Sequence, residues 1–176
     1  MIKIALSGNP NSGKSTLFNA LTGLNQKVGN YPGVTVEKRT GISSLNRDSK
    51  AEIIDLPGSY SLFPKSIDER ITQQILCNLR TDETPDVVVV VADATNLRRS
   101  VFLLSQLVDT GIRTVLALNM IDIAVQKGII VSPEYLSSKL GIDVVAINAR
   151  KRQGIELLKE KIISTNNSKN PEFLLD

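Results

Sequence analysis

Short apolar runs and amphipathic stretches alternate along the chain, which predicts a largely parallel β-sheet covered by helices on both faces. One run, DVVVVVAD, is almost entirely aliphatic, as expected of a strand buried on both sides. The predicted strands are residues 2–7, 37–45, 51–56, 86–93, 114–119 and 143–148. The predicted helices are residues 15–22, 66–79, 97–110, 133–140 and 155–164. The pattern therefore indicates the α/β class.

Two local signals refine this pattern. The polar segment NRDSK joins the second and third predicted strands and indicates a hairpin, which gives the sheet an antiparallel edge. Ser132 followed by Pro133 predicts a helix start, because proline suits the first helical position.

The chain length of 176 residues suits one domain with a substantial core. No apolar run approaches the roughly 20 residues needed to cross a bilayer, and MIKIALSGNP lacks the features of a signal peptide. From Asn166 the sequence becomes polar and ends in Pro171 and an apolar cluster. We expect residues 1–165 to form one domain. Residues 166–176 are then a frayed tail, a linker or, as we favour, the start of a further domain.

Composition excludes several kinds of site. The chain contains no histidine, which rules out histidine-based triads and histidine-ligated zinc. The lone Cys77 cannot form an internal disulfide, so a reducing compartment is favoured, and we interpret Cys77 as a small core or helix-face residue. The net charge of +3 only weakly suggests a polyanionic partner, and the phosphates of a bound nucleotide would account for it.

The segment GNPNSGKST follows the first predicted strand and fits the phosphate-binding pattern G-x-x-x-x-G-K-[ST]. Its glycines allow backbone N–H groups to point at phosphate oxygens, Lys14 reaches the β- and γ-phosphates, and Ser15 places its hydroxyl on Mg²⁺. The alternative is a plain strand-to-helix turn. The predicted nucleotide contacts in this loop are Gly8, Asn9, Pro10, Asn11, Ser12, Gly13, Lys14, Ser15 and Thr16.

A second motif, DLPG, ends the third predicted strand. Asp55 is placed to hold Mg²⁺ through water, while the Gly58 N–H is placed to meet a γ-phosphate and so to sense its presence. Such a turn is common by itself. Its position after a strand downstream of the phosphate loop makes the nucleotide interpretation strong.

The segments NMID and NAR end the last two predicted strands and predict a guanine pocket. Asp122 can accept hydrogen bonds from the N1–H and amino group of guanine, which adenine does not present there. We expect Asn119 to brace the pocket against the phosphate loop and the Ala149 N–H to donate to guanine O6. Met120, Asn148 and Arg150 complete the predicted base pocket. Each motif alone occurs by chance, whereas their order at strand ends argues for a site.

Taken together, GNPNSGKS, Thr35, DLPG, NMID and NAR resemble the small P-loop GTPases over residues 1–165. Within that group, VGNYPGVTVEKR and LPGSYSLFPKSIDER are similar to the cytosolic G domain of the ferrous-iron transport protein B (FeoB) family. The resemblance implies a three-layer Ras-like fold whose six-stranded, mostly parallel sheet has the order 2-3-1-4-5-6. It also implies binding of GTP and GDP with Mg²⁺, slow hydrolysis, and two mobile switch segments at residues 24–38 and 57–69.

The same resemblance implies a longer protein, with a helical domain and a membrane-spanning iron-transport region that this chain lacks. The fragment is then a soluble piece on the cytoplasmic side of the inner membrane. We expect guanine nucleotide and the rest of the transporter as partners, with self-association of G domains left open and no nucleic acid.

Carried over by resemblance, Thr35 is the switch residue that contacts Mg²⁺ and the γ-phosphate, with Gly33 and Val34 beside it. Its alternative is an ordinary surface threonine. The glutamine that commonly orients the attacking water after the D-x-x-G glycine is replaced here by Ser59. The predicted catalytic residues are Asn11, Lys14, Thr35 and Gly58.

Asn11 matches the asparagine that helps related GTPases bind K⁺ beside the β/γ-phosphate bridge. A cation there stabilises the charge that develops during hydrolysis. We expect backbone carbonyls near Gly29 and Asn30 to complete the K⁺ site. The alternative is that the Asn11 side chain only caps its own loop.

Other charged residues receive no functional role at this stage. Lys38-Arg39, Arg98-Arg99 and residues 150–152 are interpreted as solvated faces, and no catalytic arginine is assigned. Asp68 and Glu69 are interpreted as acids that favour a helix N-terminus.

Three functions compete: the G domain of a membrane iron transporter, an RNA-associated ribosome-assembly GTPase of the same fold, and a nucleotide-binding module without useful hydrolysis. About 25 residues follow the NAR segment, too few for an RNA-binding domain, which favours the first over the second.

Overall fold

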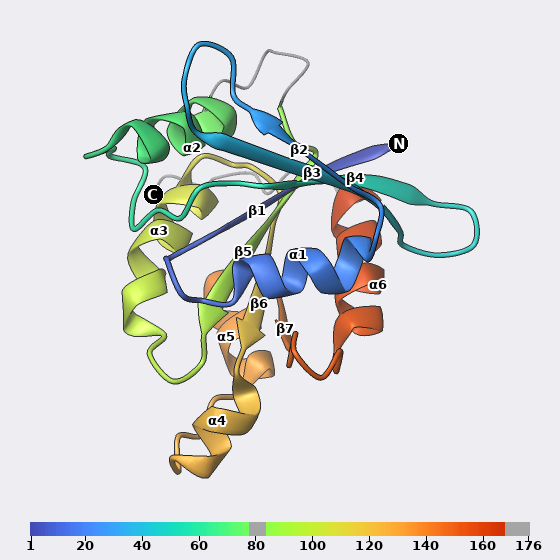
Figure 1. Ribbon diagram of the computed structural model, residues 1–176. Coiled ribbons are helices and arrows are strands. Elements are labelled where there is room, and N and C mark those ends of the chain that lie inside the picture. The colour runs from blue at the N-terminus through green and yellow to red at the C-terminus, as the bar shows by residue number, and fades with distance from the viewer. Residues whose placement is uncertain (78–83, 168–176) are drawn as a thin grey trace.

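The computed structural model describes residues 1–77 and 84–167, which form a central sheet with helices on both sides (Figure 1). The strands are β1 (Ile2–Gly8), β2 (Gln26–Asn30), β3 (Glu37–Ser44), β4 (Lys50–Asp55), β5 (Val87–Asp93), β6 (Thr114–Asn119) and β7 (Asp143–Ala146). The helices are α1 (Lys14–Thr22), α2 (Ile67–Cys77), α3 (Arg98–Asp109), α4 (Ile121–Gln126), α5 (Pro133–Leu140) and α6 (Ile155–Asn167).

The sheet has the strand order β2-β3-β4-β1-β5-β6-β7. Strands β4, β1, β5, β6 and β7 run parallel, whereas β3 is antiparallel to β4 and β2 is antiparallel to β3. The predicted order of six strands, 2-3-1-4-5-6, is confirmed. The sheet has seven strands and not the six expected, because β2 pairs with β3. The edge strand is therefore β2, and β3, which was predicted at the edge, is the second strand. The sequence of β2, QKVGN, is mostly exposed and has no apolar alternation that would have revealed it.

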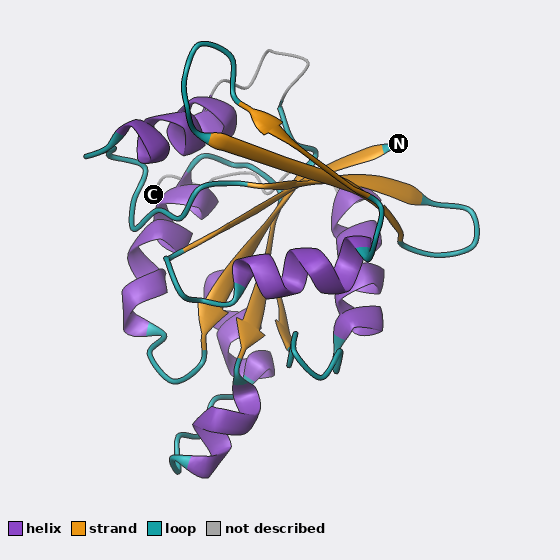
Figure 2. Cartoon of the chain, in the orientation of Figure 1, coloured by secondary structure: helices purple, strands orange, loops and turns teal. Residues whose placement is uncertain are grey.

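The core lies in two layers, one on each face of the sheet. Alternate residues of β5 separate cleanly, so that Val87, Val89 and Val91 join one cluster and Val88 and Val90 the other. The first cluster is covered by α1 and α6, and the second by α2 and α3. Figure 2 shows this sandwich of helices around the strands. The predicted three-layer fold is confirmed.

The predicted helix start at Ser132 and the predicted hairpin between β3 and β4 are both confirmed. The Ser132 hydroxyl caps α5 by accepting from the Tyr135 N–H at 3.1 Å, with Pro133 at the first helical position. In the β3–β4 hairpin, the Asn46 side chain accepts from the N–H groups of Asp48 and Ser49 at 2.9 and 2.7 Å.

One helix was not predicted, and several elements begin or end one to three residues away from their predicted limits. Helix α4 was not predicted, because only Ala124 of its six residues is buried and it lacks an apolar stripe. Helix α6 continues to Asn167, past the predicted end at residue 164. The predicted end of the helix 66–79 and the tail from residue 168 lie outside the described residues.

Cys77 lies exposed at the end of α2, as a helix-face residue. Partial desolvation by its surroundings raises the pKa of the Cys77 thiol further above neutral pH, so the thiol stays protonated. Among the helices that the structure describes, none has the length and apolar character needed to span a bilayer.

Candidate nucleotide-binding site

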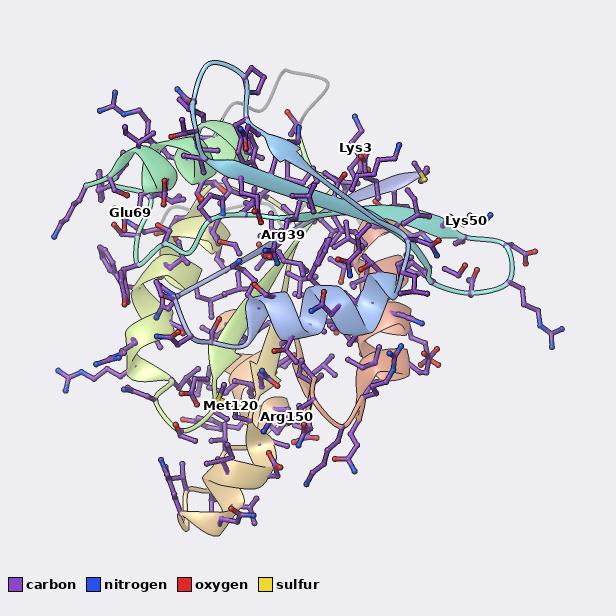
Figure 3. All side chains as sticks on the ribbon, in the orientation of Figure 1. Lys3, Arg39, Lys50, Glu69, Met120 and Arg150 are labelled. Atoms are coloured by element: carbon purple, nitrogen blue, oxygen red, sulfur yellow. The ribbon has the colours of Figure 1, made fainter. Side chains whose placement is uncertain are left out.

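The predicted motifs meet at one edge of the sheet because the parallel strands all end there. The phosphate loop follows β1, DLPG follows β4, NMID follows β6 and NAR follows β7. In open α/β sheets, ligands bind beyond the carboxyl ends of the strands. Figure 3 shows Met120 and Arg150, from two of these loops, at the same end of the molecule.

The phosphate loop is packed so closely that two of its positions require glycine. A Cβ added to Gly8 would lie 2.4 Å from the Val91 carbonyl oxygen of β5. A Cβ added to Gly13 would lie 2.1 Å from Asn119 Nδ2, and Gly13 also has φ +89°, which a side chain disfavours. The loop therefore fits only with glycine at both positions. It curls around a pocket of about 310 Å³ lined by Asn9, Pro10, Asn11, Gly13, Lys14, Ser15, Thr16 and Gly58.

Lys14, Asp55 and Ser15 form a buried polar cluster where β4 meets the start of α1. Lys14 Nζ lies 2.5 Å from Asp55 Oδ1, and the Ser15 hydroxyl donates to Asp55 Oδ2 at 3.2 Å. The Lys14 and Asp55 side chains are only 11% and 6% exposed, so water screens this ion pair weakly. The lysine predicted to bind phosphate and the acid predicted to hold metal are thus paired with each other.

The adjoining cleft brings Thr35 to the same place. It has a volume of about 440 Å³ and is lined by Lys14, Ser15, Thr35, Val36, Glu37, Arg39, Asp55, Leu56, Pro57 and Asp68. Hydroxyl and carboxylate oxygens converge here, and these are the ligands that Mg²⁺ prefers. Ser15, Thr35 and Asp55 therefore fit the predicted Mg²⁺ site. Gly33 and Val34, also predicted to touch nucleotide, precede the cleft and are absent from its described lining.

Asn119 braces the site as predicted. Its Nδ2 donates to the Ser12 carbonyl at 3.0 Å, which ties the end of β6 to the phosphate loop. Its Oδ1 accepts from the Ala149 N–H at 3.1 Å, which ties β6 to the NAR loop. The side chain is buried, so both bonds are shielded from water. The second bond was not predicted, and it occupies the N–H that we expected to donate to guanine O6. That donor is free for a base only if Asn119 releases it.

Asp122 lies in the first turn of α4 and pairs with Lys151, whose Nζ is 3.1 Å from Asp122 Oδ2. The hydrogen bond from Lys151 is the main cause that lowers the pKa of the Asp122 carboxyl below its ordinary value. Asp122 is therefore ionised at neutral pH, the state that accepts hydrogen bonds from guanine. Met120, before it, has φ +61° and turns the chain into α4.

The NAR loop is ordered by its asparagine. Asn148 Oδ1 accepts from the Lys151 N–H at 3.0 Å, and the backbone of Asn148 pairs with that of Gln153. Arg150 points away from the core and is exposed, while Ala149 is buried beside Asn119.

Asn11 is exposed in the phosphate loop with φ +67°. Within the described part of the chain its amide has no hydrogen-bond partner, so the capping alternative finds no support. Gly29 and Asn30, the expected carbonyl donors for K⁺, lie in β2 opposite Lys38 and Glu37. They do not line the Asn11 pocket, so this conformation does not bring the proposed K⁺ ligands together.

Ser59 is wholly buried and structural. Its N–H donates to the Gly8 carbonyl at 3.1 Å and its hydroxyl donates to the Ser61 carbonyl at 2.5 Å. Its side chain is therefore committed to the loop and is not placed to orient water. Gly58, just before it, packs so closely on Pro10 that an added Cβ would lie 3.0 Å from Pro10 Cγ.

The structure corrects the interpretation of the charged segments. Lys151 pairs with Asp122, and Arg152 donates to the Ala20 carbonyl at 2.7 Å, so this run is more than a solvated face. Arg39, also assigned to a solvated face, lines the cleft beside Lys14. Its position at the cleft follows from the register that places it opposite Asp55, which no signal in the sequence indicated.

Glu69 behaves as expected of an acid at a helix start. It accepts from the Lys65 N–H at 2.7 Å, while its own N–H donates to the Ser66 hydroxyl at 3.2 Å. Its neighbour Asp68 lines the cleft that contains Thr35.

Comparisons with known proteins agree with these features. The profile of a family described as ferrous iron transport protein B matches residues 2–162. The Fe(2+) transporter FeoB of Salmonella typhimurium is 42% identical over 173 residues, which make up 98% of this chain and 22% of that protein. The chain thus spans about a fifth of that relative.

Solved structures of cytosolic domains resemble the fold closely. The cytosolic domain of L. pneumophila FeoB has a TM-score of 0.87 and 46% identity, with 96% of this chain and 69% of that chain covered. The cytosolic domain of the T. maritima FeoB iron transporter in a GMPPNP form has a TM-score of 0.92 and 41% identity, with 100% of this chain and 68% of that chain covered.

Proposed function

The chain belongs to the ferrous iron transport protein B family, and from this premise we propose that it is the guanine-nucleotide-binding G domain of a membrane ferrous-iron transporter. In this proposal it binds GTP and GDP with Mg²⁺ and hydrolyses GTP slowly. A relative's structure in a GMPPNP form supports the nucleotide class.

The observation that carries the proposal is the pair of hydrogen bonds made by Asn119. They join the phosphate loop, the NMID segment and the NAR loop into one unit, although Ser12 and Ala149 lie 107 and 30 residues from Asn119 in sequence. The amide thus holds the three loops in register at the edge of the sheet where a nucleotide would bind. Asp122, ionised and at the surface of that unit, supplies the guanine-reading carboxylate.

Different residues of the cleft have different roles in binding phosphate and metal. When nucleotide binds, Lys14 would exchange Asp55 for the β- and γ-phosphates, and the freed Asp55 carboxylate would then be available to help hold Mg²⁺. Ser15 and Thr35, which line the same cleft, would supply hydroxyl oxygens to the metal. Bound Mg²⁺ would neutralise phosphate charge as the terminal bond breaks.

We further propose that K⁺ stimulates hydrolysis through Asn11. Its exposed amide, with no described partner, is available as an oxygen ligand. Because Gly29 and Asn30 lie in the exposed edge strand β2, the site forms only when part of β2 leaves the sheet. Asn11→Ala should then abolish the advantage of K⁺ over Na⁺ while GDP affinity stays within about twofold.

In the full-length protein the domain lies on the cytoplasmic side of the membrane and its nucleotide state regulates iron transport. The partners are then the helical and membrane-spanning regions, and G domains can self-associate there. The family supports this role, and the chain's share of the relative fits a regulatory module.

The first test is calorimetric titration of the chain with GDP, GTP, ADP and ATP in Mg²⁺. We expect guanine nucleotides to bind at least about a hundredfold tighter than adenine nucleotides, since Asp122 would face an unmatched base edge. Asp122→Ala should lose that selectivity and Lys14→Ala should lose binding of all four. Equal affinity for ATP and GTP would refute the proposal.

An RNA-associated GTPase of the same fold is the competing function. Retention on structured RNA in moderate salt, with an affinity that falls steeply as salt rises, would favour it. We expect no retention.

A further inference from the structure

Arg39 is the charged residue of the cleft that neither the motifs nor the proposed function uses. It lies in β3 directly across from Asp55 of β4 in the antiparallel register. Residues directly opposite each other on neighbouring strands point to the same face of the sheet. Arg39 therefore faces the side on which Asp55 contacts Lys14 and Ser15.

The packing of β3 gives an independent check of that orientation. Residues two apart on a strand share a face, so Gly41 lies on the same side as Arg39. A Cβ built on Gly41 would lie 2.6 Å from the Thr22 side chain of α1. In Figure 3, Arg39 projects from β3 toward the side on which α1 lies.

The present partner of Arg39 is Glu37, on the same face of β3. Both side chains are partly exposed, Arg39 by 42% and Glu37 by 50%. Exposed ion pairs of this kind are weak, so the guanidinium can exchange its partner at little cost. The strand begins at Glu37, two residues after the switch residue Thr35.

The lining of the cleft contains two cations, Lys14 and Arg39, and the first is already assigned to the β- and γ-phosphates. Guanidinium groups bind phosphate through two parallel hydrogen bonds, an arrangement that a lysine does not provide. A bound diphosphate has no terminal phosphate to compete with the carboxylate of Glu37, which lines the same cleft, for Arg39. In the proposed function Thr35 contacts the γ-phosphate, so a triphosphate would add negative charge to the cleft that Thr35 and Arg39 both line.

We propose that Arg39 is a specificity-determining residue that exchanges Glu37 for the terminal phosphate of a bound nucleoside triphosphate. It thereby favours triphosphate over diphosphate and couples the start of β3, next to Thr35, to the nucleotide state. The inference rests on the proposed nucleotide-binding function and assigns a further residue to that site.

The test measures equilibrium affinities for GDP and for the non-hydrolysable triphosphate GMPPNP, by competition with a fluorescent GDP analogue in saturating Mg²⁺. Arg39→Gln should weaken GMPPNP binding about tenfold and change GDP binding by less than about twofold. Glu37→Gln, which frees Arg39 from its partner, should shift GMPPNP affinity in the opposite direction. Arg39→Lys should lose less GMPPNP affinity than Arg39→Gln, because lysine keeps the positive charge but cannot form the two parallel hydrogen bonds of a guanidinium group.

Lys38→Gln is the matched control. It removes one positive charge from the adjacent residue, on the face where Lys38 Nζ lies 5.4 Å from the Tyr31 ring centre. If Lys38→Gln reproduces the effect, long-range charge explains it and the contact is refuted. Equal changes for GDP and GMPPNP in Arg39→Gln, or no change for either, also overturn the inference.

The outcomes separate this inference from the function on which it rests. A wild-type chain that binds neither nucleotide overturns the proposed function, and the role of Arg39 with it. If the wild-type chain binds both nucleotides and Arg39→Gln changes the two affinities equally or not at all, the role of Arg39 alone is overturned. Thermal unfolding of each variant identifies any loss of fold, in which case Glu37→Gln and Arg39→Lys decide the question.

Discussion

Replacing Asn119 with alanine removes the amide that joins three loops of the site. The Ser12 carbonyl loses its donor at 3.0 Å and the Ala149 N–H loses its acceptor at 3.1 Å. Asn119 is 4% exposed and Ala149 is 2% exposed, so water does not readily replace the lost partners. The variant therefore leaves two buried backbone groups without hydrogen bonds.

Each such orphaned group costs about 1–3 kcal/mol, and the carbonyl keeps a second lone pair that can find another donor. We expect Asn119→Ala to lower the free energy of unfolding of the nucleotide-free chain by about 2–4 kcal/mol. For a domain of this size, that loss lowers the melting temperature by about 4–16 °C. Nucleotide affinity should fall as well, because the phosphate loop loses its brace.

Urea unfolding followed by circular dichroism measures the loss, with Asn96→Ala as the control, because Asn96 is exposed in the turn before α3. Asn119→Asp separates the two contributions, since its carboxylate can still accept from the Ala149 N–H but cannot donate to the Ser12 carbonyl. An Asn119→Ala chain as stable as Asn96→Ala would show that the amide does not brace the loops.

Two further predictions concern the same loops. Gly13→Ala should destabilise the chain by about 1–3 kcal/mol and abolish nucleotide binding, because Gly13 has φ +89° and an added Cβ would clash with Asn119. The control is Gly111→Ala, which has a similar φ of +73° but open space around it and should leave binding intact. Loss of binding in both variants would contradict the packing argument. The Asp122 pKa lies below its ordinary value of 3.8, so the stabilising pair with Lys151 is present above that value and is lost as the pH falls through the lowered pKa. Lys151→Gln should raise this pKa toward 3.8 in a carbon-13 NMR titration, and an unmoved pKa would mean that Lys151 is not the cause.

Much of the fold could be predicted because the central strands β1, β5 and β6 are strongly apolar. The run at β5 separates into the two core layers by simple alternation, and the motifs at the strand ends fix which edge carries the site. Strand β2 could not be predicted in this way, since its residues are mostly exposed and only pairing with β3 makes them a strand.

In the candidate site, too, some residues could be predicted from the sequence and others could not. Lys14, Ser15 and Asp55 follow from motifs whose spacing reflects their contacts, and the structure brings them together. Arg39 depends on the register between β3 and β4, which the sequence does not state, so its position opposite Asp55 appears only in the folded chain. The bond from Ala149 to Asn119 likewise depends on how two loops meet.

The central claim is that this chain is a guanine-specific GTPase domain assisted by a monovalent cation. The most direct test compares GTP turnover in potassium chloride and in sodium chloride at equal ionic strength and saturating Mg²⁺, with ATP as the control substrate. The account predicts GTP turnover several-fold faster in potassium than in sodium, no such gain in Asn11→Ala, and negligible ATP turnover. Equal turnover of GTP and ATP, or equal GTP turnover in the two salts, would contradict it.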